Sequence, residues 1–271
     1  MTNATPADDL DLASDLALIE RVAREGAAIA MRYWRNDPKT WFKDGNSPVS
    51  EADLAVDAHL RETLLAERPD YGWLSEEAAE ADQDVPCGPD QPMFIADPID
   101  GTRAYLEGQR TWGVAVAVVK DGRPLAGALA CAALGADYAA RLGGGATRNG
   151  EPIRVSGDTT RPKMAGPRAW MNRMPEGYGD RIDKAPYIPS LAYRIALVAD
   201  GGLDGTYVRA SAKDWDLAAS DIILREAGGE LLREDGEPPR YGTQSRRHGL
   251  LIAGSAAQVP HMLDMVRRTP D

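Results

Sequence analysis

The pattern of helix and strand signals changes partway along this chain of 271 residues. Apolar residues recur every three or four positions over 9–32 and again over 50–68, which predicts two amphipathic helices. A short apolar run follows at 93–96, and two longer runs flank Asp121-Gly122, a dipeptide typical of a hairpin turn. The first part therefore predicts a helix pair and a largely antiparallel sheet.

Beyond a polar segment at 157–163, strand and helix signals alternate. Helices are predicted near 190–200, 215–227 and 256–268, and strands at 165–171, 206–208, 230–233 and 250–253. Such alternation is typical of α/β architecture. At about 150 residues per domain the length allows one large domain or two modest ones. We expect an α+β half over 1–156 and an α/β half over 157–271.

The balance of charges limits the class of partner. The chain has 31 Lys and Arg against 42 Asp and Glu, a formal net charge of −11. This acidity argues against binding to a nucleic acid polymer, because such binding needs a basic surface that replaces counterions. An anionic small molecule remains compatible, since a carboxylate-rich site can hold it through a bound divalent metal.

The sequence also predicts a cellular location. The N-terminal segment lacks the basic and apolar regions of a signal peptide, and the most continuous apolar run, 113–119, is far too short to span a membrane. Cys87 and Cys131 have no metal-binding spacing, and the three histidines are scattered. We therefore expect a cytoplasmic protein without membrane contact, whose chemistry depends on carboxylates.

Acidic residues cluster at three places where strands or helices begin or end, positions at which a scaffold presents functional groups. These places are Glu76-Glu77 after a short strand, the segment DPIDGT at 97–102 after an apolar strand, and Asp214-Trp215-Asp216 at a helix start.

The segment DPIDGT carries the most specific chemistry. Asp97 and Asp100 are held in a stiff turn by the intervening proline and can offer oxygen ligands, which Mg²⁺ prefers, to one point. Gly101 permits a tight turn, and amides at the following helix start can hold a phosphate. Thr102 offers a hydroxyl that can orient water. Two metals about 3.5–4 Å apart stabilise the entering and leaving oxygens of a phosphoryl displacement. The segment therefore predicts metal-assisted hydrolysis of a phosphate ester.

Each acidic position also has a purely structural explanation. DPIDGT can form an Asx-turn, and the acids at 76–77 and 214–216 can favour helix starts through the helix dipole. Asp53 stands three residues after Ser50 and can be the acid of a capping box. The combination in this order favours a functional site.

DPIDGT, the upstream Glu-Glu pair and the downstream Trp-Asp before a helix ending in Ala-Gly-Gly together resemble the inositol monophosphatase superfamily of Mg²⁺-dependent, lithium-sensitive phosphatases. The resemblance extends over about residues 12–268 and includes Lys43 ahead of SPVSEAD, GGGATRNGEPIRVS and SRRHGLLIAGS. It implies the layered αβαβα sandwich of the inositol monophosphatase and fructose bisphosphatase type, usually as a homodimer. This fold agrees with an α+β half followed by an α/β half.

The resemblance implies a set of metal ligands. Glu76, Asp97 and the carbonyl oxygen of Ile99 would hold one Mg²⁺. Asp97, Asp100 and Asp216 would hold a second, and a third, weaker ion would rest on Glu76 and water. The implied cofactor is therefore Mg²⁺, with two or three ions in each active site.

The resemblance also implies residues that act on water and phosphate. Thr102, hydrogen-bonded to Asp53, would orient the attacking water. Glu77 would support the metal ligands, and the amides of Gly101 and Thr102 would hold the phosphate. The set is complete, which argues against a binding or regulatory homologue without turnover. An unrelated acidic metal-buffer protein would leave Thr102 unexplained.

The expected substrate contacts depart from those of the inositol phosphatases. Counted back from Asp216 without gaps, the position of a sugar-contacting Glu is occupied by Arg209. The stretch of small residues that lines the ring pocket corresponds to 190–192, which ends in Ala192 and is followed by Arg194. An arginine favours phosphate or carboxylate over hydroxyl groups, although a single arginine is more often a solvated surface cation.

Ala192, Arg194 and Arg209, together with Lys213 nearby, therefore favour an anionic substrate. The most similar branch is the 3'(2'),5'-bisphosphate nucleotidases, which remove the 3'-phosphate from 3'-phosphoadenosine 5'-phosphate. Inositol-1-phosphate and histidinol phosphate are the alternative substrates within the superfamily. In each case the partner is a small phosphorylated metabolite.

Overall fold

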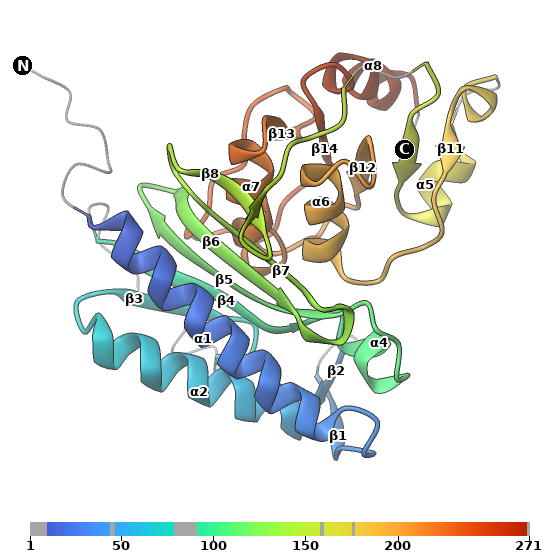
Figure 1. The fold of residues 1–271 in the computed structure, drawn as a ribbon. Coiled ribbons are helices and arrows are strands. Elements are labelled where there is room, and N and C mark those ends of the chain that lie inside the picture. Colours follow the sequence, from blue (N-terminus) through green and yellow to red (C-terminus); the bar gives the residue numbers. More distant parts are fainter. Residues whose placement is uncertain (1–9, 44–46, 79–90, 158–159, 175–176, 270–271) are drawn as a thin grey trace, which may run out of the picture.

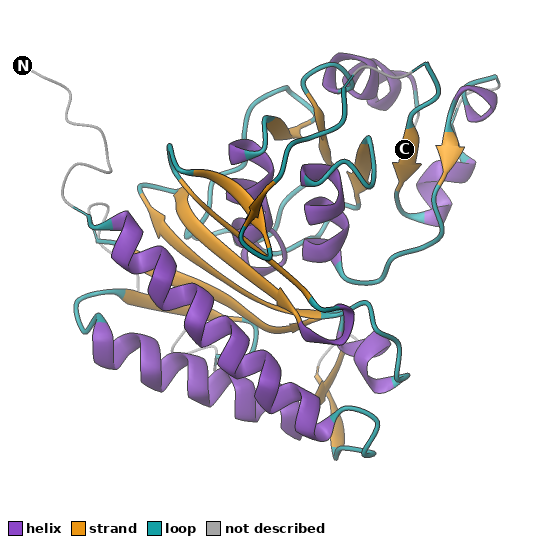
Figure 2. Cartoon of the chain, in the orientation of Figure 1, coloured by secondary structure: helices purple, strands orange, loops and turns teal. Residues whose placement is uncertain are grey.

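Two β-sheets alternate with three layers of helices in the computed structural model, which describes residues 10–43, 47–78, 91–157, 160–174 and 177–269 (Figure 1). From one face to the other the layers are a helix pair, a seven-stranded sheet, a second helix pair, a five-stranded sheet and two outer helices. Figure 2 shows the same alternation in the colours of the secondary structure. The predicted αβαβα sandwich is confirmed.

The seven-stranded sheet has the order β3-β4-β5-β6-β7-β8-β9. β3 and β4 run parallel, and the other neighbouring strands of this sheet pair antiparallel. The strands are β3 (Gly72–Ser75), β4 (Met93–Asp100), β5 (Gly113–Lys120), β6 (Arg123–Cys131), β7 (Ala136–Arg141), β8 (Gly145–Arg148) and β9 (Glu151–Pro152). Every residue of β4 is buried, because helices cover both faces of this strand.

Two long helices cover the outer face of this sheet. α1 (Leu12–Tyr33) begins at Asp11, whose side chain caps the first turn, and α2 (Glu51–Glu67) begins with a capping box between Ser50 and Asp53. Their apolar faces pack on β4, β5 and β6 around a buried cluster. Both predicted N-terminal helices are therefore confirmed.

The five-stranded sheet has the order β11-β10-β12-β14-β13 and is mixed. β10 pairs parallel with β11 and β12, whereas β14 pairs antiparallel with β12 and β13. The elements of this part are β10 (Lys163–Ala165), α5 (Arg168–Asn172), β11 (Asp183–Lys184), β12 (Gly205–Val208), β13 (Gly229–Arg233), β14 (Leu251–Ser255) and α8 (Val259–Arg268). α5 and α8 bury Trp170 and Met262 against the outer face of the sheet.

The middle layer places two helices between the sheets. α6 (Leu191–Ala199) packs on β12, and α7 (Asp214–Glu226) contacts β5 and β6 on one side and β13 on the other. Their apolar side chains belong to one buried cluster that runs from Leu74 in the first sheet to Ala253 in the second. The predicted boundary at 157–163 falls between β9 and β10, and its residues 158–159, like Cys87, lie outside the described residues.

Two expectations about local structure differ from the fold. The predicted strand at 165–171 is wrong beyond Ala165, because Pro167 cannot donate to a sheet and instead precedes α5. The hairpin of β1 (Thr40–Lys43) and β2 (Ser47–Ser50) has no counterpart among the predicted elements. Of the helices in the described ranges, none combines the length and the apolar character that crossing a bilayer requires.

Candidate active site

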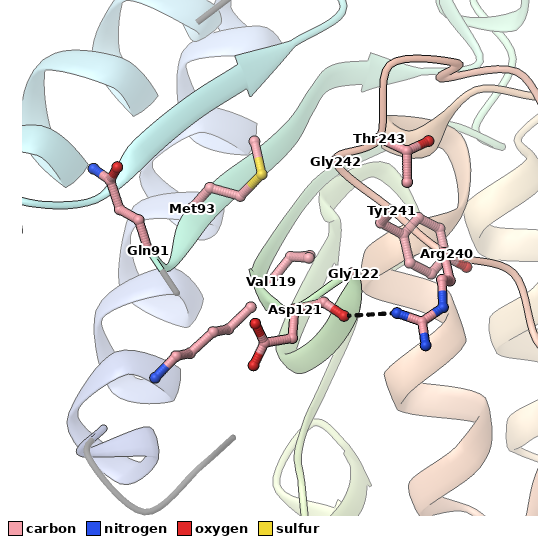
Figure 3. Close-up of a pocket in the computed structure, with 10 residues that line it drawn as sticks. Gln91, Met93, Val119, Asp121, Gly122, Arg240, Tyr241, Gly242 and Thr243 are labelled. Atoms are coloured by element: carbon pink, nitrogen blue, oxygen red, sulfur yellow. Dashed lines mark hydrogen bonds between the residues drawn. The ribbon is translucent and has the colours of Figure 1, made fainter. Parts of the chain in front are cut away.

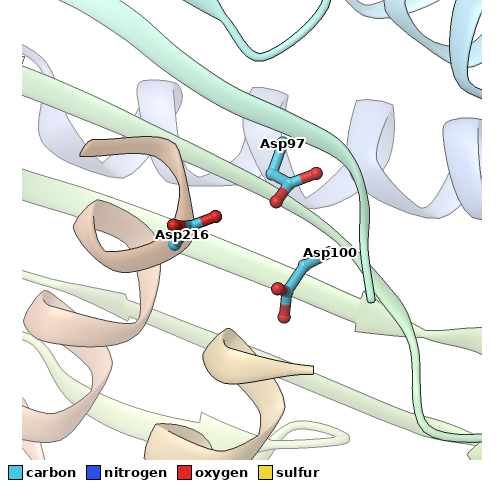
Figure 4. Close-up of side chains that lie close together, drawn as sticks. All are labelled: Asp97, Asp100 and Asp216. Carbon is cyan, nitrogen blue, oxygen red and sulfur yellow. The ribbon is translucent and has the colours of Figure 1, made fainter. Parts of the chain in front are cut away.

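Three aspartates, two from β4 and one from a distant part of the sequence, meet at the carboxyl end of β4 (Figure 4). One carboxylate oxygen from each of Asp97, Asp100 and Asp216 lies within 4.8 Å of the other two. Asp97 and Asp100 belong to β4 and are 1% and 5% exposed, whereas Asp216 belongs to the first turn of α7. The fold thus brings together the three carboxylates expected to hold the second Mg²⁺.

The backbone of DPIDGT turns both of its aspartates toward this point. The pairing of β4 with β5 shifts register between Asp97 and Asp100, and Asp97 Oδ1 accepts a hydrogen bond from the Ile99 amide at 3.1 Å. Gly101 has a φ of 94°, and a Cβ atom there would lie 3.1 Å from the carbonyl oxygen of Thr111. A glycine takes this left-handed turn without strain, so the chain can leave the strand abruptly.

Asp100 also holds the N-terminus of α6. Its carboxylate accepts hydrogen bonds from the Ser190 hydroxyl and, at 3.2 and 2.8 Å, from the amides of Leu191 and Ala192. Burial raises the pKa of Asp100, and the bonds from Ser190 and the helix amides act in the opposite direction. The start of α6 is therefore attached directly to the acidic end of β4.

Asp97 is buried and Asp216 is half-buried, and both lie close to other carboxylates. The Lys213 amide donates to Asp216 Oδ2 at 2.7 Å, so the Asp216 side chain caps the start of α7. Burial, followed by the charge of Asp100, raises the pKa of Asp216 to about 7. Burial and then the charges of Glu76 and Asp100 raise the pKa of Asp97 well above its usual value. A bound divalent cation would remove this repulsion.

Glu76 and Glu77 follow β3 beside the same cluster. Burial, followed by the charge of Asp216, raises the pKa of Glu76 to about 8. Lys43 Nζ donates to the Glu76 carbonyl oxygen at 3.2 Å and forms an ion pair with Glu77 Oε2 at 2.6 Å. Burial raises the pKa of Glu77, and the Lys43 contacts lower it. Glu77 thus forms an ion pair with Lys43, whereas the charge of Glu76 raises the pKa of Asp97.

Thr102 opens the short helix α4 (Thr102–Leu106) and contacts α2. Its Oγ1 lies 3.2 Å from Asp53 Oδ1 and 3.0 Å from the carbonyl oxygen of Ile99, and both are acceptors. Asp53 Oδ2 accepts the amide and the hydroxyl of Ser50 at 2.8 and 2.6 Å. Asp53 is buried, and burial raises its pKa. The expected contact between Thr102 and Asp53 is present, and so is the capping box.

The expected substrate contacts differ in their exposure. Ala192 is buried, and its amide is already bonded to β4. Arg194 is 6% exposed, and its Nη1 and Nη2 atoms each lie 3.4 Å from a carbonyl oxygen, of Ile188 and Tyr207 respectively. Arg209 is exposed and close enough to the aspartates to oppose the rise of a carboxylate pKa there. The two arginines therefore have different surroundings.

A backbone pairing that the sequence analysis did not predict brings further cations to this rim. Lys213 forms an isolated antiparallel bridge with Arg247, and the His248 amide donates to the Ala212 carbonyl oxygen at 2.9 Å. Burial lowers the pKa of Lys213, and the charges of Arg247 and Arg246 lower it further. No local sequence signal marks this contact, because it joins segments from different parts of the chain.

Two contacts that support the site were also missed. Ser190 binds Asp100, and the Ser75 hydroxyl donates to Asp57 Oδ1 at 2.5 Å. Asp57 stands one helical turn after Asp53, a spacing that puts both acids on one face of α2 and could have identified it. Ser190 was expected only as part of the stretch that lines the ring pocket, and no local sequence signal indicates its bond to Asp100.

A separate pocket of about 280 Å³ lies near the opposite end of β4 (Figure 3). Met93 and Val119 line it from the sheet, and Arg240 and Thr243 line it from the loop before β14. The Arg240 guanidinium donates to the carbonyl oxygen of Asp121 at 3.3 Å. As far as the described residues line it, the pocket offers no group of carboxylates, so its chemistry differs from that of the aspartate cluster.

Comparison with known families agrees with the geometry of the aspartate cluster. The model of the inositol monophosphatase family matches residues 11–262. The chain belongs to the inositol monophosphatase family. Proteins of this family are metal-dependent phosphatases. The resemblance inferred from DPIDGT and its companion motifs is thereby confirmed.

Relatives within the inositol monophosphatase family carry several names. A histidinol-phosphatase of Mycobacterium tuberculosis is 32% identical over 90% of this chain and 95% of its own length. The 3'(2'),5'-bisphosphate nucleotidase CysQ of Aggregatibacter actinomycetemcomitans is 28% identical over 81% of this chain and 84% of its own. An inositol-1-monophosphatase of Mesorhizobium japonicum is 29% identical over 81% and 83%. These names point to different substrates.

Solved structures share the fold. The Thermotoga maritima IMPase superposes with a TM-score of 0.82 at 23% identity, covering 94% of this chain and 98% of that one. Mycobacterium tuberculosis SuhB superposes with a TM-score of 0.76 at 23% identity, covering 96% and 98%. At this identity the likeness concerns the arrangement of layers.

Proposed function

We propose that this family member is a Mg²⁺-dependent phosphomonoesterase that hydrolyses a small phosphorylated metabolite at the aspartate cluster. The observation that carries the proposal is the convergence of Asp97, Asp100 and Asp216, with one oxygen of each within 4.8 Å of the others. Carboxylate oxygens suit Mg²⁺. Burial raises the pKa of all three carboxyl groups, and neighbouring carboxylates raise those of Asp97 and Asp216 further, so a divalent cation would stabilise the charged forms. The donor set therefore fits the metal.

The residues divide between metal positions as the family pattern implies. Glu76, Asp97 and the Ile99 carbonyl oxygen would hold one ion, and Asp97, Asp100 and Asp216 a second. A third, weaker ion would rest on Glu76 and water. When bound, such ions supply Lewis acidity and stabilise negative charge on phosphoryl oxygens.

Thr102 and Asp53 would orient the attacking water and accept its proton. Thr102 Oγ1 can donate to Asp53 Oδ1, which lies 3.2 Å away, and a lone pair of Oγ1 then faces the water. As the water oxygen bonds to phosphorus, one of its protons would pass to Thr102 Oγ1 and the Thr102 proton would pass to Asp53. The bond from phosphorus to the ester oxygen would break at the same time, and the leaving oxygen would take a proton from a second water molecule to give the alcohol. Glu77 would support the site by holding Lys43. The amides of Gly101 and Thr102 would bind the phosphate.

The substrate that we propose first is 3'-phosphoadenosine 5'-phosphate. Arg209 stands where inositol phosphatases place a hydroxyl-binding acid, and Arg194, Lys213 and the small Ala192 complete the proposed contacts. The relative named 3'(2'),5'-bisphosphate nucleotidase CysQ supports this choice. Histidinol phosphate is the second candidate because of the relative named histidinol-phosphatase, and inositol-1-phosphate is the third.

Phosphate release from these three esters, with Mg²⁺ and with a chelator, tests the proposal. Mg²⁺-dependent release with preference for the bisphosphate nucleotide is the expected result. Preference for either other ester would retain the metal site and overturn the substrate assignment. Release from none of them would favour a binding or regulatory homologue. Millimolar Li⁺ should inhibit by competing at a Mg²⁺ position, and full activity in its presence would remove lithium sensitivity from the proposal.

We also propose a cytoplasmic homodimer without nucleic acid polymer or membrane as partner. The net charge of −11 supports the exclusion of a polyanion as partner. Sedimentation equilibrium of the full chain would distinguish a dimer from a monomer.

A further inference from the structure

The loop over residues 242–248 is folded around one buried carboxylate, that of Asp214. Asp214 Oδ2 accepts the Gly242 amide at 2.7 Å, and Oδ1 lies 2.7 Å from His248 Nε2. The Asp214 amide in turn donates to the Arg246 carbonyl oxygen at 3.2 Å. Asp214 is the first residue of α7. Both ends of the loop are therefore attached to the helix that carries an aspartate of the active site.

Surrounding contacts fix the histidine end of this loop. The His248 ring lies 5.5 Å from the Tyr241 ring, centroid to centroid. The Tyr241 hydroxyl donates to Asp221 Oδ2 at 2.8 Å, and Asp221 forms an ion pair with Arg225 at 2.6 Å. Asp214 and Asp221 are fully buried, so removal of one partner would leave an unsatisfied buried group. This network favours a single loop conformation.

Between its two attachment points the loop presents cations to the rim of the site. Arg247 is exposed and its backbone pairs with Lys213, while Arg246 is partly buried beside it. In the described part of the chain, Arg209, Lys213 and Arg247 have no carboxylate within ion-pairing distance. In a chain of net charge −11, three cations that form no ion pair beside an acidic centre favour an anionic ligand.

We propose that the loop 242–248 recognises a second anionic group of the substrate, with Arg247 as the contact and His248 as a positioning residue that acts through Asp214. The ligand class is a phosphate monoester that carries a second phosphate group. Arginine suits this ligand because its planar guanidinium binds two phosphate oxygens at once. The inference rests on the proposed phosphatase function and names the substrate class of that site.

The experiment compares 3'-phosphoadenosine 5'-phosphate with p-nitrophenyl phosphate, which has a single phosphate, at saturating Mg²⁺. Arg247→Ala should raise the KM for 3'-phosphoadenosine 5'-phosphate about tenfold relative to the KM for p-nitrophenyl phosphate. This is the effect of losing one charge-assisted hydrogen bond. His248→Ala should raise this ratio too, with a larger effect on KM than on kcat. His248→Gln should restore it, because the amide nitrogen can still donate to Asp214. Arg267→Ala and His261→Ala, both exposed on α8, are matched controls.

A stopped-flow fluorescence titration separates this inference from the function on which it rests. It gives dissociation constants, before turnover, for the bisphosphate and for adenosine 3'-monophosphate, which lacks the 5'-phosphate that the loop would bind. Equal affinity of the wild-type protein for the two nucleotides, or a ratio of KM values that Arg247→Ala leaves unchanged, would overturn the recognition loop even if phosphate release is normal. Preferential binding without any release would overturn the phosphatase and support the loop. A His248→Gln variant as impaired as His248→Ala would overturn the positioning role.

Discussion

Asp53, Asp100 and Asp216 each stabilise a helix start and also face the candidate active site. Asp53 and Asp216 accept the amides of Ser50 and Lys213 at the starts of α2 and α7, and Asp100 accepts the first amides of α6. Helix N-termini favour such acids, because their amides lack partners and the helix dipole attracts negative charge. The structural explanation of these residues and the proposed metal-binding one are therefore compatible, and the same side chains orient the helices around the site.

Asp100→Asn separates these two tasks. The substitution removes a proposed metal ligand, so kcat/KM should fall by at least about 1000-fold. Loss of one helix bond is offset by relief of carboxylate repulsion, so the free energy of unfolding in a chelator should change by less than about 2 kcal/mol. Ser190→Ala, which removes the hydroxyl that donates to Asp100 but keeps the carboxylate, is the control and should retain most activity. Normal turnover by Asp100→Asn would refute the metal assignment.

Thr102→Val tests the proposed orientation of water. Valine keeps the shape of threonine but lacks the hydroxyl near Asp53, so kcat should fall about 100-fold or more. Half-saturation by Mg²⁺ should stay unchanged, since the hydroxyl is not a proposed ligand. Thr102→Ser should retain most of the activity. A Thr102→Val enzyme with wild-type kcat would show that the hydroxyl takes no part in the reaction.

At the scale of elements, α7 determines whether the aspartates meet. It lies between the two sheets and passes very close to β6 at Gly127. A Cβ atom at Gly127 would lie 2.5 Å from Ile222 Cγ2 and 2.6 Å from the Ala219 carbonyl oxygen. The absence of a side chain at Gly127 thus lets α7 pack close against β6, and this close packing sets the position of Asp216.

Gly127→Ala should displace α7 from the sheet. Overpacking of this kind lowers the free energy of unfolding by about 1–3 kcal/mol. The displacement also moves one of three proposed ligands, so the Mg²⁺ concentration for half-maximal activity should rise. Gly157→Ala is the control, because a Cβ atom there meets nothing within 4 Å. Thermal unfolding and Mg²⁺ titrations should differ from wild type in the first variant alone, and a shift in neither would contradict the role given to this contact.

At the scale of the whole molecule, one buried cluster joins the two sheets through α6 and α7. Two further apolar clusters are buried, one under the outer helices of each sheet. The acidic end of β4 lies within this apolar core. Burial is therefore the largest cause of the raised pKa of each carboxyl group there. Stability of the molecule and loading of the site with metal are consequently linked.

This linkage predicts a pH-dependent effect of Mg²⁺ on stability. The folded protein raises the pKa of Glu76 to about 8 and that of Asp216 to about 7, so it favours their protonated forms. Without metal, this contribution is complete below the unfolded pKa values near 4 and is lost as pH rises toward 8. Mg²⁺ binds the deprotonated groups, so the increase in Tm on adding Mg²⁺ should grow as pH rises from about 5.5 to about 8. Glu76→Gln should flatten this growth, and an increase independent of pH in wild type would contradict the linkage.

Local properties of this protein follow from residues close together in the chain. Apolar spacing predicts the helices, Asp121-Gly122 predicts the hairpin, and DPIDGT predicts a turn that presents two oxygen ligands. These features depend on backbone geometry and neighbouring side chains, so the sequence carries them directly. The family resemblance added the third aspartate and the layered fold.

Contacts between distant segments required the tertiary structure. The burial of Arg194, the bond from Ser190 to Asp100, and the attachment of the loop 242–248 to Asp214 join segments whose proximity no local pattern encodes. Burial of an apolar core selects which elements pack together, and each buried polar group must then find its partner in that packing. The types of side chain in the site are local information, whereas their shared position is a product of the fold.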